Sequence, residues 1–461
     1  MLYRLPRALA LSALALAAST FADPIDDLIQ REIETKKIPG AAVLILKDDQ
    51  VVKRAAYGLA DVEQQVKMTP EAVFESGSIG KTFTATVIMQ LVEEGKLSLD
   101  DPIAKHLGDK VPEKWRANTV RHLLAHQSGI PEYALVPSLG LVETWTLDDW
   151  WKKMAELPMD FAVGARFAYS NSNYLLLGLI AQAVAGEDIN ALRTKRILEK
   201  LELKSSLVED ARRIVPNRIP GYLLLPNGIA RGMAIPHVYG DGSLLNTLED
   251  LATFEKAFRE GRLVKPETRD LMQTAQRTTN GRKTGYGLGW MVREVNGVPT
   301  VSHGGNTGAF SNSVFTVPSE KLTIVLTMNV HNQSGDGLAQ RIAEHYAPAL
   351  APIAYKESPD PDPARTEKLL KSVKALTAGE LASADLDPDY LERLQTARGR
   401  MGLGALARFR SVESMAFLNQ EKADPDTLLR YRTKVDGKSV LLTLVVTSEG
   451  RLFQVGFRDE G

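Results

Sequence analysis

Ser78 and Lys81 stand three residues apart in the segment FESGSIGKTFTA, where an apolar pattern of helical period begins. Residues at i and i+3 lie on one face of a helix, so the Lys81 amine is within reach of the Ser78 hydroxyl. A serine with an adjacent base can attack a carbonyl carbon and form an acyl-enzyme. The spacing therefore makes Ser78 a candidate nucleophile.

The same residues fit two other interpretations. Ser78 could cap the first N–H groups of an ordinary helix, with Lys81 solvated on its surface. Gly80, Lys81 and Thr82 also match the end of the phosphate-binding motif G-x-x-x-x-G-K-[ST]. Glu75 occupies the position of that motif's first glycine, and its charge would repel phosphate. Taken alone, the pair favours the helix cap.

A second cluster, Tyr169-Ser170-Asn171, lies in a polar segment immediately before a strongly apolar helical pattern. On its own it favours a capping loop. A functional interpretation gives Tyr169 a phenol that shares a proton with Lys81 and Ser78. Asn171 would then offer its amide to a substrate carbonyl, and a lysine with such a neighbour can transfer protons near neutral pH.

A third cluster, His303-Gly304-Gly305-Asn306, ends the strand-like run VPTVSH. It fits a strand-end turn in which glycines allow unusual backbone angles. Functionally, a strand edge lined by Gly304 and Gly305 lets a substrate backbone lie alongside it, and an amide N–H there can bind an oxyanion. His303 would face the substrate or the tyrosine phenol.

Ser-x-x-Lys, Tyr-x-Asn and His-x-Gly in this order resemble the serine β-lactamase and penicillin-recognising hydrolase superfamily, in its class C-like branch. The phrases VRHLLAHQSGIPEY, GDGSLLNTLEDLATF and YGLGWMV are similar to that family too. The resemblance covers about residues 25 to 350. It implies a nucleophile at Ser78, proton transfer by Lys81 and Tyr169, and an Asn171 that holds Lys81 and the substrate. The oxyanion would lie between the N–H groups of Ser78 and Asn306, and no cofactor is needed.

One departure from the family pattern bears on the substrate. Members that hydrolyse β-lactams begin the strand motif with lysine, whereas this chain has His303. A histidine is mostly neutral near pH 7, so it attracts a β-lactam carboxylate less. The resemblance therefore implies amide or ester bonds, in D-amino-acid peptides or small esters as in D-aminopeptidases, D-alanyl-D-alanine carboxypeptidases and related esterases. The alternatives are β-lactam hydrolysis and a non-catalytic sensor of peptidoglycan or β-lactams.

The remaining histidines give no metal site. His122 and His126 have a metal-compatible spacing, but no third ligand is evident nearby. The other histidines are scattered and we expect surface or structural roles for them, at His106, His237, His331 and His345.

The elements that must position these clusters come in a set order. We expect a helix over 26–38, a hairpin of strands over 41–49 and 51–61, and then helices from 78 to 94, 173–186 and 250–258. Strands return over 285–295, 298–305, 309–318 and 321–329, and a helix over 336–350 follows. Strands at both ends with helices between them predict an α+β domain with one antiparallel sheet built from its two ends.

Alternating prolines and charges in YKESPDPDPART predict a stiff linker, which divides the chain into a hydrolase-like domain, 23–352, a linker, 353–365, and a small domain, 366–461. Helical patterns over 367–376 and 387–398, then strand patterns over 409–417, 428–435, 439–447 and 451–458, predict a small α+β unit. It resembles a curved sheet on a helix, as in cystatins or nuclear-transport-factor-like domains. We expect it to have a structural role, or to bind a partner or a second copy.

The first 22 residues have two arginines, an apolar Ala/Leu run and small residues ending at Ala22, which is typical of a secretory signal peptide. The chain has no cysteine, so disulfides and a cysteine-linked lipid are excluded. We expect export to the periplasm, or alternatively to the medium, with no membrane anchor in the mature chain. The formal charge of -1, or -3 once Arg4 and Arg7 are removed (54 basic against 57 acidic residues), gives no basic face for nucleic acid. The expected partner is a small-molecule or peptide substrate.

Overall fold

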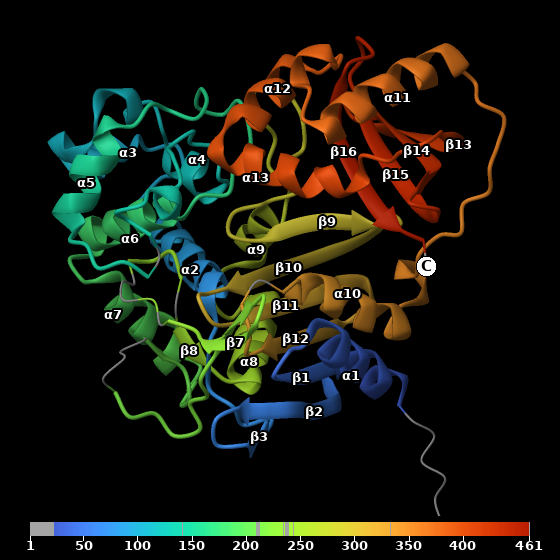
Figure 1. The fold of residues 1–461 in the computed structure, drawn as a ribbon. Coiled ribbons are helices and arrows are strands. Elements are labelled where there is room, and N and C mark those ends of the chain that lie inside the picture. Colours follow the sequence, from blue (N-terminus) through green and yellow to red (C-terminus); the bar gives the residue numbers. More distant parts are fainter. Residues whose placement is uncertain are drawn as a thin grey trace, which may run out of the picture.

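A seven-stranded antiparallel sheet joins the two ends of the larger unit (Figure 1). The computed structural model describes residues 23–140, 142–208, 213–233, 235, 239–242, 244–331 and 333–460, so the expected signal peptide and His237 lie outside the described residues. The strands are β1 (Gly40–Lys47), β2 (Gln50–Asp61), β3 (Val66–Lys67), β9 (Met291–Val295), β10 (Val298–Asn306), β11 (Ser311–Val317) and β12 (Leu322–Met328). Their order is β3-β2-β1-β12-β11-β10-β9, and Ala41 of β1 pairs with Met328 of β12. The expected α+β class with a sheet from both ends is confirmed.

Both faces of this sheet are covered, so every residue of the central strands β11 and β12 is buried. Alternate side chains of a strand point to opposite faces. Val43 and Ile45 join a core with α1 (Pro24–Lys36) and α10 (Gly335–Tyr346), whereas Ala42 and Leu44 join the core of the helical region. The sheet is therefore a rigid layer between two cores, and β10 carries the third predicted cluster along it.

The helical region lies between β3 and β9 in the chain. Its helices are α2 (Gly80–Glu93), α3 (Ile103–Leu107), α4 (Val120–Leu124), α5 (Leu147–Glu156), α6 (Asn171–Ala185), α7 (Ile189–Arg193), α8 (Leu248–Arg259) and α9 (Pro266–Met272). Short strands accompany them: β4 (Phe74–Glu75), β5 (Leu207–Val208) and β8 (Leu244–Asn246) in one small sheet, and β6 (Tyr222–Leu225) with β7 (Gly228–Arg231). Helix α2 is buried from Gly80 to Leu91, so it is the central helix of this region.

Among the described residues, no single helix is long and apolar enough to cross a membrane. One bent pair, α6 with residues Ile189–Glu199, meets that test by length and composition only, and it turns by 80°. Leu175, Leu176 and Leu177 of α6 are fully buried in the core of the helical region.

A separate C-terminal domain follows, drawn in orange and red in Figure 1. It consists of α11 (Pro363–Ala378), α12 (Pro388–Gln395), α13 (Ala397–Leu406) and an antiparallel sheet of β13 (Ala416–Ala423), β14 (Asp426–Val435), β15 (Lys438–Val446) and β16 (Leu452–Asp459). Leu369 and Leu376 of α11 pack with Leu442 and Leu444 of β15 in a core of its own. Figure 1 shows this domain beside β9 and the helical region.

Three sequence expectations about elements are wrong in part. Residues 285–290 form turns before β9, because Gly285 and Gly289 have positive φ angles of 71° and 96°. Residues 410–415 are not a strand, and β13 begins only at Ala416. Helix α13 was not expected, because its three glycines, Gly399, Gly402 and Gly404, lower helix propensity.

Candidate active site

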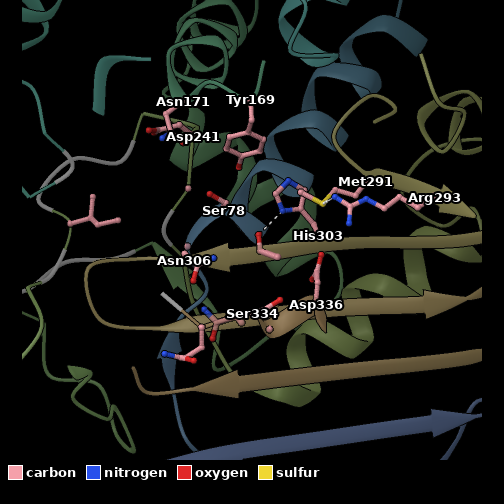
Figure 2. A pocket seen from close by; sticks show the side chains of 17 residues that line it. Ser78, Tyr169, Asn171, Asp241, Met291, Arg293, His303, Asn306, Ser334 and Asp336 are labelled. Carbon is pink, nitrogen blue, oxygen red and sulfur yellow. Dashed lines mark hydrogen bonds between the residues drawn. The ribbon is translucent and has the colours of Figure 1, made fainter. Parts of the chain in front are cut away.

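One cavity of about 470 Å³ brings the three predicted clusters together, and Figure 2 shows its lining side chains. The predicted residues in its wall are Ser78, Tyr169, Asn171, His303, Gly304 and Asn306. Lys81 lies directly behind Ser78 and is fully buried. Gly305 is also buried, and it brings β10 close to the Ser78 turn, since a Cβ there would lie 1.9 Å from the Ser76 carbonyl oxygen. All eight predicted site residues therefore belong to one place.

The Ser78 turn is a 3₁₀ segment, η1 (Gly77–Ile79), that leads directly into α2. Gly77 has a φ angle of 58°, which a residue without a Cβ adopts freely. Gly80 packs against Gly242, where a Cβ would approach backbone atoms to 2.8 Å. The helix-cap interpretation is wrong in its second half, because Lys81 is buried rather than solvated.

Lys81 makes three hydrogen bonds through Nζ, and together they restrict where its exchangeable proton can go. It donates to Asn171 Oδ1 at 2.6 Å, to the Asp241 carbonyl oxygen, and contacts Ser78 Oγ at 3.1 Å. A carbonyl oxygen only accepts, so two of the three directions must hold N–H groups. A hydroxyl can both donate and accept, so the contact with Ser78 is the one along which a proton can pass either way.

Glu132 orients the amide of Asn171. Its buried carboxylate accepts the Asn171 backbone N–H at 2.7 Å and the side-chain Nδ2 at 3.2 Å. A carboxylate accepts, so the amide nitrogen must face Glu132 and the amide oxygen must face Lys81. Glu132 also accepts from the Ala134 N–H at 2.9 Å, so the loop after α4 is locked around this group.

The Asp241 carbonyl that binds Lys81 sits in a loop held from several sides. Thr84 Oγ1 donates to the Gly240 carbonyl at 2.6 Å, and Arg193 Nη1 donates to the Gly242 carbonyl at 3.0 Å. The Tyr133 hydroxyl donates to Asp241 Oδ2 at 2.5 Å. Burial, with the Asp241 carboxylate next in effect, raises the pKa of Tyr133, so this phenol stays protonated as a donor.

Tyr169 lies over the Lys81 ammonium group. Lys81 Nζ is 5.1 Å from the centroid of the Tyr169 ring. Behind the tyrosine, the buried His126 ring lies 4.4 Å from the Tyr169 ring, and His126 Nδ1 accepts the Ser170 N–H at 3.1 Å. His126 thus connects the loop after α4 to the Tyr169 segment and supports the phenol in place.

His303 is nearly fully buried, and its ring is fixed by two hydrogen bonds. Nδ1 lies 2.7 Å from the Gly304 carbonyl oxygen, which only accepts, so Nδ1 carries the proton. Nε2 lies 3.0 Å from the hydroxyl of Tyr286, which therefore donates to it. Burial, with the Lys81 charge second, lowers the pKa of His303 to about 3, so the imidazole is neutral. Of the two tyrosines near it, His303 is bonded to Tyr286, whereas its ring is 6.2 Å from Tyr169.

The edge of β10 is open beside the nucleophile. β9 pairs with β10 only from Val298 to Ser302, whose partner is Met291. From His303 to Asn306, the described pairing of β10 is with β11 on its other side. This open edge borders the cavity with Ser78, which suits an extended substrate lying as an added strand.

Charged groups lie at the far end of the cavity, beyond Gly304. Asp336, in the first turn of α10, accepts from Ser313 Oγ at 2.5 Å and from Ser302 Oγ at 3.1 Å. Burial raises the pKa of Asp336, while the two serines act in the opposite direction. Arg293, from β9, lines the same end of the cavity. With His303 neutral, Arg293 is the cation among the described lining residues, and its charge acts to lower the pKa of Asp336.

His122 and His126, the pair with metal-compatible spacing, have separate structural roles. His122 Nδ1 accepts the Thr119 N–H at 3.2 Å in a helix cap, while His126 supports Tyr169. His106 pairs with Asp101 at 3.0 Å. Among the described residues, no group of three or more His, Asp and Glu side chains is placed to hold a metal ion.

Sequence reasoning missed Glu132, Tyr286, His126 and Asp241. They lie within the phrases VRHLLAHQSGIPEY, GDGSLLNTLEDLATF and YGLGWMV, which the sequence marked as family-like without giving them a role. Their position inside these phrases was the available signal.

The fold and the cavity define a class: a sheet with a helical region against it, and a Ser-x-x-Lys pair facing a tyrosine and an open strand edge, as in penicillin-recognising proteins. Residues 25–347 match the family described as Beta-lactamase, and the chain belongs to that family.

The matches to individual relatives cover only part of each relative's length. Protein flp of Staphylococcus aureus (strain MW2) is 28% identical over 324 residues, 67% of this chain and 63% of the relative. A D-aminopeptidase of Brucella anthropi is 28% identical over 311 residues, 65% of this chain and 58% of the relative. The chain thus spans less than two thirds of the length of these relatives.

Solved structures agree with the fold. A D-stereospecific amidohydrolase from Streptomyces sp. has a TM-score of 0.60 and 28% identity, over 70% of this chain and 98% of that chain. An octameric penicillin-binding protein homologue from Pyrococcus abyssi has a TM-score of 0.62 and 23% identity, over 95% of this chain and 98% of that chain. The second likeness extends over the C-terminal domain as well, and it concerns the fold alone.

Proposed function

We propose that this protein is a serine hydrolase that opens amide or ester bonds through an acyl-enzyme on Ser78. The observation that carries the proposal is the contact of 3.1 Å between Lys81 Nζ and Ser78 Oγ. The other two hydrogen bonds of Nζ go to oxygens that only accept, on Asn171 and Asp241. Ser78 Oγ would attack the carbonyl carbon while its proton passes to Lys81 and Tyr169. The developing oxyanion would be bound by the N–H groups of Ser78 and Asn306.

The acyl-enzyme is then released by water. In the first step, the bond from Ser78 Oγ to the carbonyl carbon forms, the bond to the leaving group breaks, and the leaving atom receives the serine proton. In the second step, Tyr169 with Lys81 takes a proton from water as its oxygen bonds to the acyl carbon. The bond from that carbon to Ser78 Oγ then breaks, Oγ receives the proton, and the carboxylic acid leaves. These residues need no cofactor for either step.

For the substrate, we favour D-amino-acid peptides or amides, or small esters. The D-aminopeptidase and D-stereospecific amidohydrolase relatives support this class. The neutral His303 supports it too, because this position gives no positive charge to a β-lactam carboxylate. β-lactam hydrolysis is the alternative.

Cellular location is part of the proposal. The first 22 residues have the charge and apolarity of a secretory signal, so we propose export to the periplasm. In the periplasm the enzyme would meet small molecules or peptides that enter from the cytoplasm or from the medium.

The test is a side-by-side screen of a nitrophenyl ester, D-amino-acid peptides and a chromogenic cephalosporin, with Ser78→Ala beside the natural protein. Ser78→Ala is expected to abolish turnover and covalent labelling by a fluorophosphonate. Ser334→Ala is the matched control, because Ser334 lines the same cavity and lies away from Lys81. Labelling that survives in Ser78→Ala would contradict the proposal. Intact-mass spectra that keep a stable adduct on the natural protein would instead indicate the non-catalytic sensor.

A further inference from the structure

A second cavity, of about 880 Å³, lies between the hydrolase-like domain and the C-terminal domain. We call it the interdomain cleft. One wall comes from the loop after α4 and from residues 157–168, and the other comes from α12, α13 and β16. Apolar side chains predominate on the first wall, for example Ile130, Leu135 and Phe161, and the second wall adds Leu394, Leu406 and Val455 among polar side chains. The C-terminal domain therefore builds half of a cavity that the catalytic domain alone would leave as a surface.

The interdomain cleft and the active-site cavity share one lining residue, Tyr169. Tyr169 lines both cavities, and Glu132, which orients Asn171, lines the cleft. In the proposed mechanism Tyr169 carries a proton, and Glu132 acts on Lys81 through the Asn171 amide. A part of the substrate that extends past Tyr169 would reach the side of this residue that lines the cleft.

The chemistry decides which part of the substrate extends there. When Ser78 Oγ bonds to the acyl carbon, the bond from that carbon to the leaving oxygen or nitrogen breaks. The serine proton must then reach the leaving atom, and it is carried by Lys81 and Tyr169. The leaving group must consequently lie on the Tyr169 side of the scissile bond.

We propose that the interdomain cleft binds an extended apolar leaving group of the substrate. The inference rests on the proposed hydrolase function and adds the substrate class to it: esters or amides whose alcohol or amine part carries a bulky hydrocarbon or aromatic group. The C-terminal domain then acts as a specificity element of the catalytic site.

The charges of the cleft narrow the class further. Arg166 and Arg393 line it from opposite domains, and Arg166 forms an ion pair with Glu392 at 2.5 Å. The Arg166 side chain is only 10% exposed, and its Nε has no hydrogen-bond partner among the described residues. The described lining holds three guanidinium groups, of Arg166, Arg393 and Arg400, against two carboxyl groups, of Glu132 and Asp160, so its formal charge is positive and favours neutral or anionic leaving groups.

A series of acetate esters measures how the leaving group affects kcat/KM. Every acetate gives the same acetyl-enzyme on Ser78, so deacylation is identical throughout, and kcat/KM reports acylation and leaving-group binding. We expect kcat/KM to rise about two- to fourfold for each methylene added from ethyl to hexyl acetate. We also expect 3,3-dimethylbutyl acetate to be cleaved faster than its cationic isostere, acetylcholine.

The chain offers a variant that fills the cleft and a matched control. Gly402 of α13 lines the cleft, and a Cβ there would meet no atom within 4 Å, so Gly402→Phe places a ring at the cleft wall from an unobstructed Cβ. Gly404 of the same helix also has open space and lies outside the cleft lining. Gly402→Phe is expected to lower kcat/KM for hexyl acetate by about tenfold while changing ethyl acetate less than twofold. Gly404→Phe should leave both values unchanged.

Three results would overturn the inference. Equal kcat/KM values across the acetate series in the natural protein would remove the cleft from substrate binding and leave the serine hydrolase standing. Equal losses in Gly402→Phe and Gly404→Phe would do the same. No turnover of any acetate by the natural protein would contradict the proposed function, and the inference would fail with it.

Discussion

At the scale of single residues, the chemistry depends on one hydrogen bond that can work in both directions. Lys81 is held by two carbonyl-type acceptors, so only its contact with Ser78 can change direction. We expect Lys81→Ala and Tyr169→Phe each to lower kcat by about 10²- to 10⁴-fold, because each removes a proton carrier. Steady-state kinetics on a nitrophenyl ester measure this, and urea unfolding checks that each variant is folded. Unchanged kcat in both folded variants would take these residues out of the mechanism.

His303 predicts a pH dependence of stability. Burial lowers its folded-state pKa to about 3 from the ordinary value of 6.5. Between these values the unfolded chain binds a proton that the folded protein excludes, so folding is favoured above pH 6.5 and disfavoured as pH falls. The difference in unfolding free energy between the natural protein and His303→Gln should shrink on acidification, by at most about 1.4 kcal/mol per pH unit. Urea unfolding from pH 7 to pH 4.5 measures it, and a constant difference would contradict a buried, neutral His303.

The clusters containing Ser78, Tyr169 and His303 could be predicted from the sequence, because short spacings fix which residues share a turn, a loop or a strand end. The partner of His303 could not. From the sequence, either Tyr169 or Tyr286 could be the hydrogen-bond partner of His303. The turns before β9 bring the Tyr286 hydroxyl to His303 Nε2. The carboxylate of Glu132 was missed for a similar reason, since nothing in PEY shows that it folds back onto Asn171.

At the scale of elements, the loop after α4 controls the direction in which the Asn171 amide points. Glu132→Gln keeps the size of the side chain but supplies a group that can donate as well as accept. The Asn171 amide can then turn over and present its nitrogen to Lys81. We expect kcat to fall by about tenfold or more with little change in the thermal midpoint, because the loss is one of orientation. Glu113→Gln, on an exposed 3₁₀ turn, is the control. Equal kcat values for Glu132→Gln and the natural protein would show that the amide keeps its orientation without the carboxylate.

Helices and strands with a clear period were predictable, and the exceptions have local causes. β1 and β12 are mostly apolar, since both sides of each strand are buried. Residues 285–290 carry the same apolar pattern, but glycines with positive φ angles turn that segment away from the sheet. α13 forms despite three glycines, because Gly399 packs closely on α12, where a Cβ would lie 1.9 Å from the Arg393 carbonyl oxygen.

At the scale of the whole molecule, the composition shift around residues 355–366 predicted two domains, but it held no information on how they meet. The contact depends on Arg282, which the sequence shows only as one charge in a polar turn. Its guanidinium donates to Asp426 through Nε at 2.8 Å and Nη2 at 3.2 Å, and it lies 4.0 Å from the Phe453 ring centroid. These partners are more than a hundred residues further along the chain, beyond the range of any local pattern.

Arg282 should therefore hold the C-terminal domain in place, and with it the second wall of the interdomain cleft. Asp426 is only 5% exposed, and Asp387 and Asp389 lie within 3.8 Å of the guanidinium. Arg282→Met would leave these carboxylates without their cation, at a cost of roughly 2 to 4 kcal/mol. We expect calorimetry to show a separate, earlier transition for the C-terminal domain, and faster proteolysis between residues 353 and 362. Arg277→Met is the matched control, because Arg277 and Asp424 are about half exposed and 3.7 Å apart, a pair worth at most about 1 kcal/mol. A single unshifted transition in Arg282→Met would mean that other contacts, such as the Arg166–Glu392 ion pair and the apolar walls of the cleft, suffice to join the two domains.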